Sequence, residues 1–111
     1  TREEVFQLRA IQHSVNVSAG VREYITDIVR ATREDPSLTL GASPRAAVAL
    51  FRISRAAALV AGRDFATPDD VKQHALPVLR HRVLLAPELQ VEGRSTDDVI
   101  GAVLSRVPAP K

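Results

Sequence analysis

The chain has 111 residues, of which 45% are hydrophobic and 25% are charged, which is enough for one domain with a modest core. It contains no cysteine, which excludes disulfides and thiolate metal sites, and no apolar run long enough to span a membrane. Basic and acidic residues are interspersed and aromatic residues are few, so we do not expect nucleic acid as a partner. No Met and no secretory signal are present, so we expect a cytoplasmic piece of a longer protein.

The first third of the chain predicts two helices separated by a short extended stretch. Thr1 and Glu4 form a capping box for a helix that runs to about His13. The β-branched segment at 15–17 is predicted to be extended, and Ser18 is predicted to cap the second helix. One apolar stripe at helical spacing follows, formed by Val21, Tyr24, Ile25, Ile28 and Val29.

A third helix is predicted from Pro44 to about Ala61, with Gly62 as its C-terminal stop. Apolar residues fill most of its circumference, so we expect it to be the central and most buried helix. One basic stripe interrupts this surface, formed by Arg45, Arg52 and Arg63, with Arg55 beside it.

The second half of the chain predicts two more helices. Thr67 and Pro68 start the fourth, with Asp69 and Asp70 in its first turn, and Pro77 should break or kink it. Ser95 or Thr96 is predicted to start the last, with Asp97 and Asp98 in its first turn.

Two short segments favour a strand, the residues RHRVLLA at 80–86 and VNV at 15–17, and each is the best partner for the other. The predicted fold class is therefore all-α, a compact bundle of four to five helices with at most a few short strands. The whole chain, 1–111, is expected to form one domain.

The start of the third helix departs from a rule that other helix starts in this chain obey. A helix N-terminus carries about half a positive charge, and the starts TREE, TPDD and STDD place acids there. After Ser43 and Pro44 comes Arg45 instead, at a local cost of about 0.3–1 kcal/mol. A cation beside free backbone N–H groups suits an external anion such as phosphate. The alternative is that Arg45 bends away into solvent.

Five segments follow one another along the chain: YITDIVRATRE, GASPRA, GRDFATPDDV, PVLRHRVLL and VIGAVLSRVPAP. Together they resemble the C-terminal lid of the MoxR family of AAA+ ATPases. In that family the arginine of GASPR is the sensor 2 residue, so the resemblance implies that Arg45 reaches the γ-phosphate of ATP. Gly41, Ser43 and Pro44 would lie beside the nucleotide. The resemblance implies ATP and Mg²⁺ as cofactors, bound mainly by a P-loop domain of the same protein.

The resemblance also implies a parent ATPase that forms a ring, commonly a hexamer, and acts as a chaperone-like machine in maturation or metal insertion. Proteins with von Willebrand factor A domains are the implied partners. The chain has no Walker A motif, so alone it is not expected to hydrolyse ATP. Two alternatives stay open, the lid of a magnesium-chelatase-like AAA+ subunit and a free-standing helical module that binds nucleic acid or protein.

Other charged residues have competing interpretations. The cluster Arg80, His81 and Arg82 either touches a neighbouring subunit or its nucleotide, or forms a solvated turn. Arg33 either shapes the nucleotide pocket or complements the C-terminus of its own helix.

Neither the Arg63–Asp64 pair nor the histidines predict a catalytic or metal site. Arg63 and Asp64 are expected to pair locally and shape the turn after the third helix. No metal site is expected, because no paired ligand spacing joins the three histidines, His13, His74 and His81.

Overall fold

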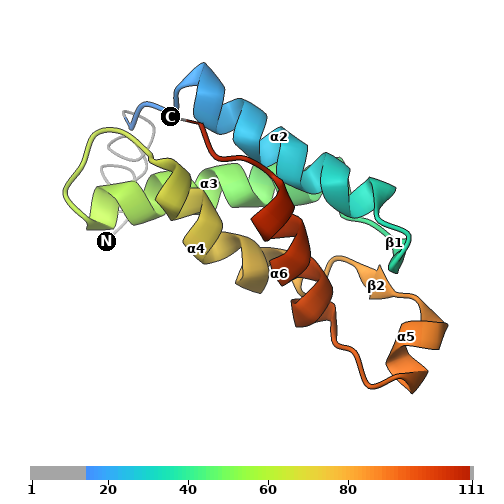
Figure 1. Ribbon diagram of the computed structural model, residues 1–111. Helices are drawn as coiled ribbons and strands as arrows, with labels where there is room; N and C mark the ends of the chain where they lie inside the picture. Colours follow the sequence, from blue (N-terminus) through green and yellow to red (C-terminus); the bar gives the residue numbers. More distant parts are fainter. Residues whose placement is uncertain (1–14, 111) are drawn as a thin grey trace.

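The computed structural model describes residues 15–110, so the first predicted helix, from Thr1 to about His13, lies outside the described residues. The described elements, labelled as in Figure 1, are α2 (Ala19–Glu34), β1 (Leu38–Leu40), α3 (Pro44–Val60), α4 (Pro68–Leu79), β2 (Leu84–Leu85), α5 (Pro87–Val91) and α6 (Thr96–Arg106). Five helices and one strand pair make up this region, which confirms the predicted all-α fold class.

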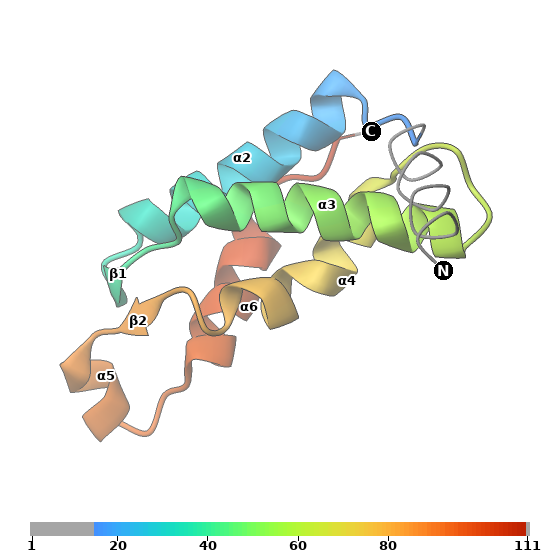
Figure 2. The ribbon, with the colours of Figure 1, turned by 180° about the vertical axis from the view of Figure 1, so that it is seen from behind.

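The helices pack around one shared core. In both views α2 and α3 lie side by side along the molecule, and α4 and α6 pack beneath them (Figures 1 and 2). The most extensive contact joins α3 to α4, and α6 contacts both α2 and α4. The two strands and α5 lie at one end, and the loop between α3 and α4 lies at the other. The largest fully buried side chains come from all four long helices, among them Ile28, Leu50, Leu79 and Ile100.

The stripe predicted for the second helix is confirmed. All five of its residues are buried in α2, and Thr32 continues it by one more turn. The helix begins at the predicted cap, where the hydroxyl of Ser18 accepts a hydrogen bond from the Val21 N–H. Burial of this one face anchors α2 on the core, while its charged residues stay at the surface.

The third helix is not the most buried one, which corrects the prediction. Its buried residues repeat every fourth position and form one narrow stripe, Ala46, Leu50, Ser54 and Ala58. Val60 at its C-terminal end is 89% exposed. Much of the apolar composition of α3 is alanine, which costs little when it faces water, so composition alone overstated its burial.

The predicted basic stripe on this helix is also interrupted. The helix ends at Val60, and Gly62 turns the chain with a φ of 77°. Arg63 therefore lies in the loop after the helix and not on the line of Arg45 and Arg52. The predicted stripe was wrong at Arg63, because the helical period does not continue past a glycine in the left-handed conformation.

The predicted strand near residue 84 is confirmed, but its partner was predicted wrongly. β2 pairs antiparallel with β1, Leu38 opposite Leu85. The segment at 15–17 forms only an isolated parallel bridge, between Asn16 and Phe65. β1 was not predicted, because its three residues lie between a proline turn and Gly41, and a segment bounded in this way is typical of a loop.

Two further features of the helices differ from the predictions, the end of α4 and the presence of α5. α4 continues through Pro77 to Leu79, so the predicted break is wrong. Pro77 stands in the last turn, where a missing N–H removes only one hydrogen bond before the helix ends. The short helix α5 was not predicted, although Pro87 at its first position and Gly93, with a φ of 82°, mark its two ends.

Candidate functional site

The start of α3 differs from the other helix starts at a Ser or Thr. Ser43 has the extended backbone of a cap residue, but its side chain accepts no hydrogen bond from the first turn. At the other three such starts in residues 15–110 the cap hydroxyl does accept one: Ser18 from the Val21 N–H, Thr67 from the Asp70 N–H and Ser95 from the Asp98 N–H. The first turn of α3 is therefore left without a side-chain cap.

Arg45 is the second residue of this uncapped turn and is exposed to solvent, as are Ser43 and Pro44. None of the ion pairs between described residues involves Arg45. A guanidinium at this place meets the positive end of the helix dipole with no acid beside it. This arrangement favours an anion that comes from outside the described part of the chain.

Thr32 and Gly41 fix the loop before α3 to the end of α2. The buried hydroxyl of Thr32 donates to the Val29 carbonyl at 2.6 Å and accepts from the Ala42 N–H at 3.0 Å. A Cβ on Gly41 would lie 2.4 Å from the Cα of Arg33, so only glycine allows this approach. The direction in which α3 begins is thereby set relative to α2.

A cavity of about 310 Å³ lies between α2 and the start of α3. Pro44 and Ala47 line one side, and Val29, Arg30 and Arg33 line the other. Arg33 and Pro44, two residues singled out from the sequence, thus face the same cavity. Arg30 was missed, although it precedes Arg33 by three positions and so lies on the same side of a helix.

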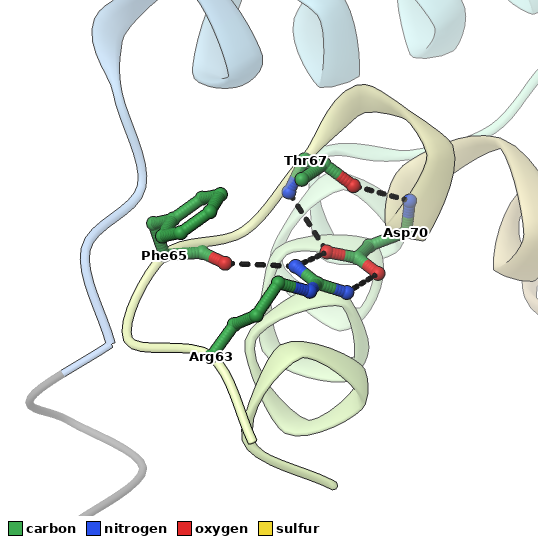
Figure 3. A network of polar contacts seen from close by, with 4 residues as sticks. All are labelled: Arg63, Phe65, Thr67 and Asp70. Atoms are coloured by element: carbon green, nitrogen blue, oxygen red, sulfur yellow. Dashed lines mark hydrogen bonds and ion pairs between the residues drawn. The ribbon is translucent and has the colours of Figure 1, made fainter. Parts of the chain in front are cut away.

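Arg63 pairs with Asp70 and not with Asp64, which corrects the predicted local pair (Figure 3). Its two terminal nitrogens donate to the two carboxylate oxygens of Asp70 at 2.8 and 2.7 Å, and one also donates to the Phe65 carbonyl. Asp70 further accepts from the Thr67 N–H as part of a capping box. The hydrogen bonds from Arg63 lower the pKa of Asp70 more than burial raises it. This network stabilises the α3–α4 turn, and the charges of Arg63 and Asp70 are paired with each other.

The basic cluster after α4 divides into one paired residue and two exposed ones. Arg80 donates to both carboxylate oxygens of Asp97, at 2.8 and 3.0 Å, and so joins the end of α4 to the start of α6. His81 and Arg82 are exposed. Arg80 therefore has a structural role that the sequence did not predict, because its partner is 17 residues away.

Within residues 15–110, no three acidic or histidine side chains gather where they could hold a metal ion. None of the helices in that range has the length and apolar character needed to cross a lipid bilayer.

Residues 30–103 match the family described as the AAA lid domain, more than half of the chain. An uncharacterized protein, YeaC, from Bacillus subtilis is 38% identical over 96% of the chain. The chaperone MoxR1 of Mycobacterium tuberculosis is 32% identical over 97%, and the protein MoxR of Methylorubrum extorquens is 31% identical over 91%. The chain spans about a third of the length of these relatives, 33%, 31% and 34% respectively.

A solved structure shows the same fold. A Cytophaga hutchinsonii protein, described as a presumed ATPase, superposes with a TM-score of 0.91 and 33% identity. The match covers 98% of this chain and 36% of that one. The chain therefore belongs to the AAA lid domain family and is the lid of a MoxR-like AAA+ ATPase.

Proposed function

We propose that this lid closes over ATP bound to a P-loop domain of the same protein, and that Arg45 acts as the sensor 2 residue. The observation that carries the proposal is the uncapped start of α3, where Arg45 is exposed and has no carboxylate partner among the described residues. Gly41, Ser43 and Pro44 present this turn, and Thr32 holds it in place.

Arg45 would act by electrostatic stabilisation of the γ-phosphate. During phosphoryl transfer, negative charge is spread over the oxygens of the γ-phosphate. A planar guanidinium offers several N–H donors to two of these oxygens at once, which a lysine ammonium does not. The first-turn N–H groups of α3 add their dipole in the same direction. The residues present fit a phosphate, while the phosphate cradle and the Mg²⁺ ligands would come from the P-loop domain.

The parent protein is proposed to be a cytoplasmic, chaperone-like ATPase in maturation or metal insertion. It would assemble as a ring, with a hexamer as the expected form, and would work with a partner that carries a von Willebrand factor A domain. The chaperone-like role is supported by the similarity to MoxR1, which is named a chaperone.

Steady-state ATP turnover of the full-length protein tests the role of Arg45. Arg45→Ala should lower turnover about 10- to 150-fold, because a charge-assisted contact to phosphate contributes about 1.5–3 kcal/mol. Arg45→Lys should recover part of that loss. The matched control is Arg52→Ala, two turns further along the same helix, which should stay near the wild-type rate. Equal, near wild-type rates for Arg45→Ala and Arg52→Ala would refute the proposal.

A further inference from the structure

A second cavity of about 310 Å³ continues the one beside Pro44. The two cavities share Thr26 and Ala47, so together they form one depression that we call the α2–α3 groove. It extends along α2 from Arg33 to Arg22, which is about 16 Å at the helical rise per residue. This length matches about three turns of a helix laid in the groove.

The walls of the second cavity are mainly apolar. Ile25 comes from α2, and Ala47, Val48 and Phe51 come from α3. Val48 is 49% exposed, which leaves apolar surface uncovered in the described structure. The Phe51 ring packs against two guanidiniums, with centroid distances of 5.6 Å to Arg22 and 4.7 Å to Arg55. These contacts hold the ring in the wall of the groove.

Five charged residues of α2 line cavities on two different sides of the helix. Three arginines line the α2–α3 groove, Arg22, Arg30 and Arg33, and no acidic residue lines either of its cavities. Glu23 and Asp27 line a different cavity, against the C-terminal residues 108–110. Asp27 does approach Arg30 at 3.9 Å, but an exposed pair at that distance contributes little. The groove is thus apolar inside and positive along its α2 edge.

We propose that the α2–α3 groove binds a short acidic helix of a partner protein. Apolar side chains on one face of that helix would enter beside Val48 and Phe51, and carboxylates on its edge would pair with Arg22, Arg30 and Arg33. This is the helix-in-groove mode of peptide recognition, with charge complementarity giving orientation. Nucleic acid fits less well, because phosphates gain nothing from the apolar walls and the Phe51 ring is already packed against guanidiniums.

The test uses the full-length protein and a fluorescein-labelled peptide, read by fluorescence anisotropy. The peptide places leucines at helical spacing and glutamates at its other positions, and a matched peptide carries glutamine for every glutamate. We expect the acidic peptide to bind and the glutamine peptide not to bind. Arg22→Glu should weaken binding about tenfold. Val48→Glu should do the same by placing a like charge in the wall, whereas Arg94→Glu, in the distant α5–α6 loop, should leave binding unchanged.

Each contrary result overturns the proposal. No binding of the acidic peptide up to about 1 mM would mean that the groove does not recognise this chemistry. Equal binding of both peptides, or equal binding to the wild type and to Arg22→Glu, would place the interaction elsewhere. Tighter binding of a DNA duplex, lost with the same two substitutions, would assign the groove to nucleic acid. ATP turnover of Arg22→Glu should match the wild type, which separates this proposal from the role of Arg45.

Discussion

Replacing Asp70 with alanine removes the carboxylate that holds the turn between α3 and α4. Asp70 accepts two hydrogen bonds from Arg63 and one from the Thr67 N–H, and its side chain is only 7% exposed. Losing one partner of a buried ion pair costs about 3–5 kcal/mol. The Arg63 side chain is 29% exposed and can turn partly to water, so we expect a loss of about 2–3 kcal/mol.

Urea denaturation at neutral pH measures this loss. Asp69→Ala is the matched control, because Asp69 stands in the same first turn of α4 but is exposed. It should cost no more than about 0.5 kcal/mol through the helix dipole. A difference below about 1 kcal/mol between the two variants would refute the assignment of Asp70 as the residue that fixes the turn.

The same pair predicts how stability depends on pH. The Arg63 hydrogen bonds lower the pKa of folded Asp70 below the unfolded value of about 3.9. Its contribution is therefore complete above the unfolded pKa and is lost as pH falls through that value toward the folded one. The stability gap between wild type and Asp70→Ala should be constant above about pH 5 and should shrink below about pH 4. A gap that persists unchanged at about pH 3 would contradict the ionic origin of the effect.

Three further predictions test the core, the α2–α3 connection and the nucleotide site. Leu50→Ala, at a fully buried position, should cost about 2–5 kcal/mol in denaturation, and a loss below about 0.5 kcal/mol would contradict its burial. Gly41→Ala should destabilise by about 1–3 kcal/mol because its Cβ meets the backbone of Arg33, whereas Gly101→Ala, with open space around it, should be neutral or stabilising. NMR titration of this chain with Mg-ATP should show at most weak shifts near Gly41 to Arg45, and micromolar binding would reject the need for a P-loop domain.

The sequence was sufficient where local chemistry decides the structure. Ser18 and Thr67 cap helices as predicted, and Ser95 is the cap of the two candidates at 95 and 96, because a side-chain acceptor three residues before an N–H is a purely local arrangement. The buried stripe of α2 follows from residue spacing in the same way. β1 was missed because three residues carry too little pattern to identify a strand, and its pairing depends on β2, more than forty residues later.

The candidate site was predictable only in part, because ion pairs depend on tertiary geometry. Arg63 was assigned to its sequence neighbour Asp64, yet the turn after Gly62 brings it to Asp70. Arg80 meets Asp97 only because α4 and α6 pack together. Arg45 could be singled out as a candidate from the sequence because its signal is local, a cation in a first turn that favours acids, and its role stays a prediction.

The two motifs that flank α3, GASPRA and GRDFATPDDV, differ in whether their charged side chains have partners within the described residues. In GRDFATPDDV the arginine, the last aspartate and the threonine are hydrogen-bonded to one another, so few of their polar groups remain for an outside ligand. In GASPRA the serine caps nothing, and no ion pair between described residues reaches Arg45. An uncapped turn and a cation are each a small cost that the same chain avoids at α4 and α6. Both costs fall on one turn, which Gly41 and Thr32 hold in place. Because the fold itself does not require either cost, we propose that this turn receives an anion.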